Sequence, residues 1–490
     1  MKRFARVLGL VACLGVLVAG FAARTVPKRP PAARLVTAPA PVQPLIPATQ
    51  GLTTSWYCPG VPTVGASGRG GTFTLVNPSD TVVDATVTIF PLGAPPIVRP
   101  VRIGQRGRAD IVAAELTQAS YAAALVELAG AQIGVEQSAN GATGTSVTPC
   151  TVDPSSSWIF PDGSTRADAS LIIVLFNPFP GDAVVDLSFA DEDGRRITKK
   201  FEGRVVPARS IVAFDIGDVI QRKALVSVAA KVRDGVVIAG RVQTYGGGDS
   251  GRLGLIAGPG IPASATAWRF AIGRKGAGPD GINPVSDRIV VHNPGDNDAE
   301  VAVTVLSAAD AAAPTNETSG TVPAPPEPLR LTVAPHETGV IDLGQAPSVP
   351  VGVFNLSVNS TEPIAVERVI DYAGTPTPAT TVVGGSRLAA PVWYFPAGLP
   401  SGTRGLLAIL NSTAAPMNVV VKAIGAAGPT PVAGYEKVAV PAGGVVVLPL
   451  GDKAVAGLPL VVEADGPIVA ERTIIAPVGW SSSLGLPLIG

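Results

Sequence analysis

One short motif begins four times along the chain. It reads Trp-Tyr-Cys-Pro-Gly from Trp56, Trp-Ile-Phe-Pro-Asp-Gly from Trp158, Trp-Arg-Phe-Ala-Ile-Gly from Trp268 and Trp-Tyr-Phe-Pro-Ala-Gly from Trp393. The chain has only five tryptophans, so four of them at matching places mark a repeat. The intervals of 102, 110 and 125 residues have the length of whole domains rather than of solenoid units. The motif therefore predicts four successive domains.

Each copy continues with segments that have the pattern of β-strands. An apolar segment follows the tryptophan and ends in asparagine, at Asn77, Asn177, Asn293 and Asn411. Proline follows the first three of these asparagines, which predicts a turn in which the amide side chain bonds back to the chain. The next segments, residues 83–89, 185–189 and 301–305, alternate apolar and polar residues. A period of two predicts strands with one buried and one solvated face.

The copies are rich in apolar residues and in turn residues, and they hold six or seven expected strands each. Gly 56 and Pro 48 supply turns, and no long helical period is present. We predict an all-β chain with four tandem immunoglobulin-like antiparallel β-sandwich repeats after an N-terminal signal or anchor and a Pro-rich linker. A β-propeller is the alternative, with one or two blades per copy. The expected segments are 1–23 (signal peptide or membrane anchor), 24–50 (linker), 51–152, 153–262, 263–387 and 388–490.

The amino terminus has the pattern of an export signal. Lys2, Arg3 and Arg6 precede an apolar run over residues 7–23, and residues 20–22 resemble a cleavage site. An uncleaved membrane anchor is the close alternative, because 17 apolar residues are near the lower limit for crossing a bilayer. Residues 24–50 are rich in proline and alanine and predict a semi-extended spacer. We therefore expect an extracytoplasmic protein, secreted or anchored to the cytoplasmic membrane.

The cysteines agree with export. Besides Cys13 in the apolar run, the chain has only Cys58 and Cys150, at the start and the end of the first copy. Outside the cell, such a pair predicts a disulfide. A metal site is disfavoured, because two thiolates without nearby histidines do not complete a tetrahedral shell.

No pattern of catalytic residues is present, so we expect neither an enzyme nor a cofactor or metal site. The two histidines, His292 and His336, have no partners at metal-ligand spacing. Seven of the 37 basic residues lie before residue 35, which leaves 30 basic against 37 acidic residues in the rest, a net charge of −7. An acidic body argues against nucleic-acid binding. The third copy carries insertions over residues 272–287 and 307–330, which are either mobile or sites of binding.

Two recurring features are expected to serve structure. The dipeptides Glu367-Arg368 and Glu471-Arg472 close the last hairpin of copies three and four, where we expect ion pairs between strands or sheets. The motif tryptophans are expected to seal the junctions between domains, with sugar stacking as the alternative. Trp480 lies outside the motif and is the better candidate for an exposed, ligand-contacting aromatic.

The fourth copy carries a resemblance to a known repeat. Trp393-Tyr-Phe-Pro-Ala-Gly, Asn411 and the segment Pro-Ile-Val-Ala-Glu-Arg that ends at Arg472 resemble the repeat of an uncharacterised, secreted or membrane-anchored actinobacterial family, a domain of unknown function. The resemblance covers residues 51–490 and implies extracellular β repeats with a role in the cell envelope. It carries over no catalytic residue. The first copy departs from it at Cys58 and Gln137, and the third at Ala271.

These observations favour a non-catalytic scaffold or adaptor of the cell envelope, which binds a protein or a wall polymer. The alternative is an array of carbohydrate-binding modules on wall polysaccharide. The membrane would be a partner only through an uncleaved N-terminal segment.

Overall fold

The alternation of apolar and polar residues produces strands throughout the described part of the chain. The computed structural model describes residues 43–46, 53–63, 70–130, 132–248, 251–277, 282–307, 327–373, 378–451, 453 and 455–488. All of them belong to one compact unit, Pro41–Gly490. The expected signal segment, most of the linker, and residues 278–281 and 308–326 of the third copy's insertions lie outside the described residues. Among the described residues, strands are joined by turns and three short 3-10 helices, η1 (Ala113–Glu115), η2 (Lys199–Phe201) and η3 (Ile216–Asp218).

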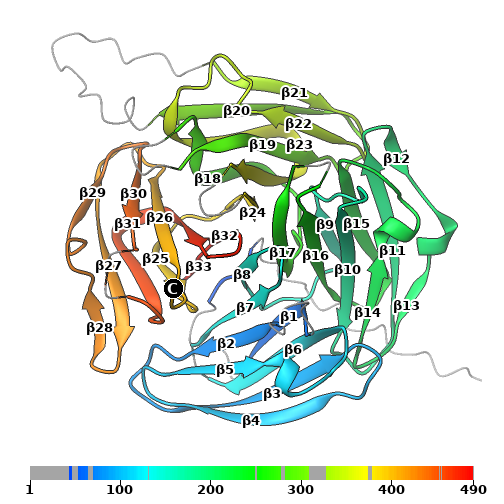
Figure 1. Ribbon diagram of the computed structural model, residues 1–490, viewed down its shortest axis with the longest axis horizontal. Coiled ribbons are helices and arrows are strands. Elements are labelled where there is room, and N and C mark those ends of the chain that lie inside the picture. Colours follow the sequence, from blue (N-terminus) through cyan, green and yellow to red (C-terminus); the bar gives the residue numbers. More distant parts are fainter. Residues whose placement is uncertain are drawn as a thin grey trace, which may run out of the picture. The chain divides into compact units, whose positions relative to one another are not determined.

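The strands fall into four groups in chain order, which we call repeats 1 to 4 (Figure 1). Repeat 1 contains β1 (Thr53–Pro62), β2 (Thr72–Val76), β3 (Val83–Pro91), β4 (Ile97–Ile103), β5 (Arg108–Val112), β6 (Tyr121–Ala129), β7 (Gly134–Asn140) and β8 (Thr145–Pro149). Repeat 2 contains β9 (Ser157–Phe160), β10 (Ala169–Asn177), β11 (Ala183–Asp191), β12 (Gly194–Arg196), β13 (Arg204–Val206), β14 (Ser210–Asp215), β15 (Val226–Asp234), β16 (Ile238–Gly246) and β17 (Leu253–Pro259).

Two long strands distinguish the second half of the chain. Repeat 3 contains β18 (Ala265–Lys275), β19 (Pro284–His292), β20 (Ala299–Ser307), β21 (Leu329–Val333), β22 (Thr338–Asp342), β23 (Gly352–Tyr372) and β24 (Ala379–Gly384). Repeat 4 contains β25 (Ala390–Phe395), β26 (Arg404–Asn411), β27 (Met417–Gly425), β28 (Gly428–Pro431), β29 (Val438–Val440), β30 (Val445–Pro449), β31 (Leu460–Ile475), β32 (Trp480–Leu484) and β33 (Leu486–Pro487). The strands β23 and β31 each run through both sheets of their repeat.

The four groups pair their strands in corresponding order. In repeat 1, one sheet has the order β1-β6-β3-β4 and the other β5-β2-β7-β8, and all pairings are antiparallel. Repeat 2 has the equivalent sheets, β9-β15-β11-β12 and β14-β10-β16-β17. In repeats 3 and 4 the first half of β23 or β31 replaces β6, and the second half replaces β7. We call the sheet that contains β2, β10, β19 or β26 the inner sheet of its repeat.

The core of each repeat lies between its two sheets. In repeat 1, for example, Trp56 and Val87 of one sheet share a buried cluster with Phe73 and Val135 of the other. Two sheets that bury their facing sides against each other form a sandwich, whereas the blades of a propeller pack against neighbouring blades. The sandwich-like, all-β architecture predicted from the sequence is therefore confirmed.

The repeats also contact each other, through the last strand of each inner sheet. The strand β8 lies against both β17 and β32, and β24 lies against both β17 and β32. Figure 1 shows these four strands facing one another, each contributed by a different repeat. Repeat 4 therefore contacts repeat 1, and the contacts between successive repeats form a closed cycle within the described residues.

Candidate functional site

The tryptophan of each motif lies in the core of its repeat. Trp56, Trp158, Trp268 and Trp393 are all buried, with at most 1% of their surface exposed. The indole N–H of Trp158 donates to Val237 O at 2.9 Å, and that of Trp393 donates to Ile468 O at 2.9 Å. Each ring therefore fills the sandwich of its own repeat rather than the junction between domains that the sequence predicted, and its faces are not available to a ligand. In Trp158, Trp268 and Trp393 the indole N–H also ties the first strand to the last hairpin.

The asparagine of each copy organises the turn that follows it. The amide nitrogen of Asn177 donates to Gly181 O at 2.8 Å and to Val206 O at 3.0 Å, and its carbonyl oxygen accepts from Phe179 N at 3.1 Å. Corresponding bonds hold the other three asparagines, Asn77, Asn293 and Asn411, all fully buried. These amides satisfy backbone groups that the turn removes from the sheet, so their role is structural.

The predicted disulfide between Cys58 and Cys150 is present, with a Cα–Cα distance of 4.7 Å. Both cysteines are buried in the core of repeat 1. The bond joins the first strand of the repeat to the segment that leads into repeat 2, where Tyr57 and Thr151 also exchange backbone hydrogen bonds.

The glutamate–arginine dipeptides lie at the junctions between repeats. Arg241 of repeat 2 forms a two-bond ion pair with Glu367 of repeat 3, at 3.0 and 2.9 Å, and both side chains are almost completely buried. Glu367 also accepts a hydrogen bond from the backbone N–H of Asp162, in the Trp motif of repeat 2. Burial raises the pKa of Glu367 above its usual value, although Arg241 opposes this shift. The motif of one repeat thus binds the inner sheet of the next.

The junction between repeats 4 and 1 has the same design. Arg472 Nη2 donates to Glu136 Oε1 at 2.7 Å, and Nη1 donates to Gly398 O at 2.7 Å. Glu136 also accepts from the backbone N–H of Ala397, in the Trp motif of repeat 4. Both charged side chains are fully buried. This ion pair joins the first and last repeats, which are not adjacent in sequence.

The junction between repeats 3 and 4 has a weaker form of the pair. Arg368 Nε donates to Asp287 of its own repeat at 2.9 Å, and its Nη1 lies 3.6 Å from Glu471 Oε1. Among the described residues, neither carboxylate oxygen of Glu471 accepts a hydrogen bond. Burial raises the pKa of Glu471 to about 7, although Arg368 opposes this shift. The third Trp motif has Ala271 where the three other copies have proline, and no backbone N–H of this motif donates to the carboxylate of Glu471.

The junction between repeats 1 and 2 carries no ion pair of this kind. Gln137 replaces the arginine and donates to Gly60 O at 3.2 Å. Gly240 replaces the glutamate, and a Cβ there would lie 2.7 Å from the ring of Pro59. Both charges are absent from the same junction, so neither is left buried without a partner.

A second charged network lies beside the junction of repeats 2 and 3. Asp162 accepts from the hydroxyl of Tyr245 at 2.9 Å and from Arg252 at 3.0 Å. Burial alone would raise the pKa of Asp162, but the cations Arg252, Arg288 and Arg241 lower it below its usual value. The carboxylate is therefore a fixed counter-ion, and the hydroxyl of Tyr245 has a pKa raised well above its usual value by burial. Neither group is prepared for proton transfer near neutral pH.

The expectation that Trp480 is exposed is wrong. Only 4% of its surface is exposed, and its ring centroid lies 4.1 Å from that of Tyr372 in repeat 3. Ile282 and Leu406 complete this cluster. Trp480 thus packs in the junction between repeats 3 and 4. Its burial depends on tertiary contacts, which a local sequence pattern does not show.

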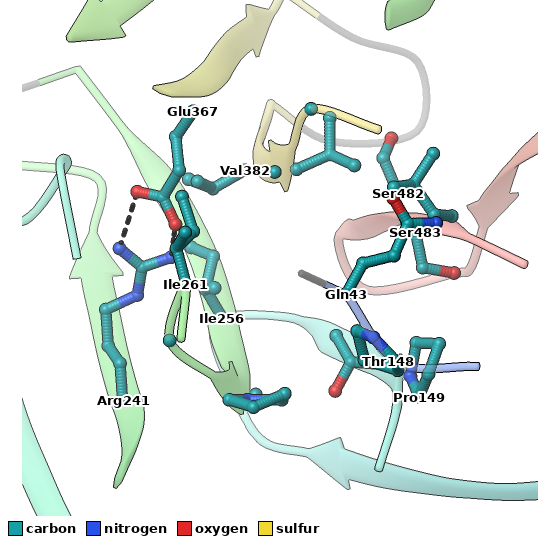
Figure 2. A pocket seen from close by; sticks show the side chains of 18 of the residues that line it. Gln43, Thr148, Pro149, Arg241, Ile256, Ile261, Glu367, Val382, Ser482 and Ser483 are labelled. Atoms are coloured by element: carbon teal, nitrogen blue, oxygen red, sulfur yellow. Dashed lines mark hydrogen bonds and ion pairs between the residues drawn. The ribbon is translucent and has the colours of Figure 1, made fainter. Parts of the chain in front are cut away.

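A cavity of about 120 Å³ lies where the four repeats meet. Figure 2 shows Thr148, Ile256, Val382 and Ser482 around it, one from each repeat, together with Gln43 of the linker. Gln43 Oε1 accepts hydrogen bonds from Ser386 Oγ and from the backbone N–H of Arg387, both at 2.9 Å. Gln43 therefore forms part of the wall of the cavity. The cavity is a small space within the packed junction of the four repeats.

The described residues contain no group of histidine, cysteine and acidic side chains that could hold a metal ion. His292 is buried, and its ring lies 3.0 Å from the hydroxyl of Thr338. Burial and the neighbouring His336 lower the pKa of His292 to about 4, so it is neutral near pH 7. In the described part of the chain, no helix is long and apolar enough to cross a membrane.

The sequence singled out four of the residues in the junction ion pairs, in copies three and four. It did not identify Asp162, Asp287, Tyr245 or Arg252, which bind partners in other segments. The sequence also relates Glu136 and Arg241 to these dipeptides, because Glu136-Gln137 and Gly240-Arg241 are variants at the same hairpin positions as Glu471-Arg472.

A model for a family of unknown function (DUF5719) matches residues 106–391. No curated protein matches the chain. Among solved structures, "Crystal Structure of Thermotoga maritima 1070" is 16% identical with a TM-score of 0.19, over 25% of this chain and 94% of that chain. The Anabaena sensory rhodopsin transducer is 25% identical with a TM-score of 0.16, over 21% and 91%. TM-scores this low support no argument about fold or function.

Proposed function

We propose that this chain, which belongs to the family of unknown function DUF5719, acts as a non-catalytic scaffold or adaptor outside the cytoplasmic membrane. The observation that carries the proposal is the chain of buried ion pairs between repeats, Arg241 with Glu367, Arg368 with Glu471 and Arg472 with Glu136. Their geometry fixes the repeats relative to each other, as a binding platform requires.

The location outside the membrane is part of the proposal. The disulfide between Cys58 and Cys150 is consistent with an oxidising compartment. The basic and apolar segment 1–23 and the Pro-rich segment 24–50 support secretion, or anchoring through an uncleaved signal. We also propose that the Trp-Tyr-Phe, Asn-Pro and Pro-Ile-Val-Ala-Glu-Arg motifs define an extracellular repeat of actinobacterial proteins. The mass of the mature amino terminus tests whether the signal is cleaved.

The proposed partner is an envelope protein or a wall polymer. The alternative, an array of carbohydrate-binding modules, is less well supported because the tryptophans of all four motifs are buried. Sugar binding, if present, has to use other residues.

Capture of the tagged full-length protein from envelope extracts, followed by mass spectrometry of proteins and glycans, tests this function. We expect specific partners that are absent with a tag-only control. Hydrolase or transferase turnover that a single point substitution abolishes would contradict the proposal.

A further inference from the structure

Three of the four junctions between repeats are filled by large side chains. At the first, the rings of Phe90 and Phe176 lie 4.9 Å apart. At the second, Tyr245 of repeat 2 shares a buried cluster with Val290 and Val369 of repeat 3. At the third, Tyr372 packs on Trp480. These side chains occupy space between the repeats concerned.

The fourth junction, between repeats 4 and 1, lacks these side chains. Tyr245 and Tyr372 each follow the junction arginine of their repeat by four residues, and Ala476 occupies this position after Arg472. On the facing repeat 1, the pairing of β7 with β8 places Thr145 opposite Asn140. In repeat 4, the equivalent pairing of β31 with β32 places Trp480 opposite Ile475, so Thr145 occupies the position of Trp480. A tyrosine and a tryptophan at one junction are thus replaced by an alanine and a threonine at the other.

The missing side chains leave a groove with a volume of about 730 Å³. This volume lies within the range of small-molecule sites, about 300–1,000 Å³. Its floor is the face of the repeat 1 inner sheet that points away from the core of that repeat. This face is lined by Thr72, Thr74, Ser138 and Asn140. Its other wall consists of residues 400–403 and 476–478 of repeat 4.

The floor of the groove differs in chemistry from the same face in repeat 2. Thr72 and Thr74 lie five and three residues before the turn asparagine, where repeat 2 has Ile172 and Val174. Ser138 follows Gln137 as Val242 follows Arg241 in repeat 2. In repeat 2 these apolar side chains face repeat 1 and are covered by it. In repeat 1 the face carries hydroxyl and amide groups instead.

One charged pair lies in the groove, and it is internally neutral. Arg108 Nε donates to both carboxylate oxygens of Asp110 at 2.9 Å, and Thr74 Oγ1 donates to the same carboxylate at 2.7 Å. The side chains of Arg108 and Asp110 remain 30% and 41% exposed. They can therefore offer planar sets of donors and acceptors to a ligand that brings no net charge.

We infer that this groove binds a neutral, hydroxyl-rich ligand, one or two saccharide units of a polysaccharide chain. Hydroxyl and amide side chains match vicinal sugar hydroxyls, which both donate and accept hydrogen bonds. A paired arginine and aspartate disfavours a strongly anionic or cationic ligand. The inference rests on the proposed extracytoplasmic function, because it assigns the wall-polymer contact of the scaffold to one groove.

The test is binding of the purified full chain to an array of neutral gluco-, galacto-, manno- and arabino-oligosaccharides of two to six units, with affinities by calorimetry. We expect at least one neutral series to bind. An array of uronic-acid oligosaccharides and unrelated peptides is the comparison, and binding to these alone would overturn the inference. Absence of binding to every neutral oligosaccharide would also overturn it.

The groove is tested by the substitution Ala476→Tyr, which restores the side chain of repeats 2 and 3. We expect it to lower saccharide affinity by about tenfold or more, because the ring occupies the space of the ligand. Ala426→Tyr is the matched control, since Ala426 lies in an exposed turn between β27 and β28, and it should bind as the unmodified protein does.

A second variant keeps the test valid if the new tyrosine disturbs folding. Asp110→Asn preserves shape but removes the carboxylate, and we expect about tenfold weaker binding from a lost charged hydrogen bond. Affinity unchanged in both groove variants would place the saccharide elsewhere and overturn the inference. Envelope partners that are still captured by a protein without saccharide binding would leave the scaffold proposal standing, whereas failure of the unmodified protein to capture any envelope partner would contradict that proposal separately.

Discussion

Removing the guanidinium of Arg472 alone should destabilise the protein more than removing the whole ion pair between repeats 4 and 1. Arg472 and Glu136 are fully buried, and their closest atoms are 2.7 Å apart. In Arg472→Met the carboxylate of Glu136 stays buried with the Ala397 N–H but without its cation. An uncompensated buried charge of this kind costs about 3–5 kcal/mol of unfolding free energy.

The double variant Glu136→Gln/Arg472→Met removes both charges. The amide oxygen introduced at position 136 still accepts from Ala397 N–H. We therefore expect the double variant to recover at least about 2 kcal/mol of the unfolding free energy that Arg472→Met loses. The natural precedent is the junction between repeats 1 and 2, where Gln137 and Gly240 stand in place of the pair.

The assay is urea unfolding of the wild type, both single variants and the double variant, followed by circular dichroism and tryptophan fluorescence. The four free energies give the coupling energy of the pair. Equal, additive losses in the two single variants would refute the reasoning, because they would mean that neither charge depends on the other.

Three further predictions concern single groups. The pKa of Glu471 is about 7 in the folded protein and 4.5 in the unfolded chain. Protonation of Glu471 therefore stabilises the folded state fully below pH 4.5, and this stabilisation is lost as the pH rises through 7. Urea titrations at pH 5 and 8 should therefore show Glu471→Gln gaining stability relative to wild type by up to about 3 kcal/mol at the higher pH; a constant difference would contradict this. Replacing Cys58 and Cys150 by serine should cost about 2–5 kcal/mol in the same unfolding assay, and an unchanged midpoint would argue against a stabilising bond. Because Trp480 and the four motif tryptophans are buried, iodide should quench the native fluorescence only weakly and the unfolded fluorescence strongly.

The sequence predicted those features that depend on local pattern. The turn asparagines, the alternating strand that begins at Val83 and the disulfide follow from residues close in sequence or from the small number of cysteines. The partner of Glu367 could not be predicted, because Arg241 lies 126 residues away in another repeat. The expectation for Trp480 failed for the same physical reason, since its burial depends on Tyr372 across a junction. Contacts between repeats are set by packing that no single repeat encodes.

The groove between repeats 4 and 1 illustrates what the repeated structure adds. In the sequence, Ala476 and Thr145 are ordinary small residues. Only the pairing of strands shows that they occupy the positions of Tyr372 and Trp480 at the neighbouring junction. Comparison of equivalent positions within one chain, together with the packing of each junction, then identifies the junction that is not filled.

The closed cycle of repeats is tested most directly by the distance between spin labels on repeats 1 and 4. Ala142 and Val478 are exposed and line the same groove, and the neighbouring Thr145 hydroxyl donates to Val478 O at 3.3 Å. Labels attached to cysteines at these two positions should give one short and narrow distance distribution by double electron–electron resonance. An open row of four 100-residue domains, each with a radius of gyration of about 13 Å, would separate the labels by roughly 100 Å. A long or broad distribution would contradict the closed cycle.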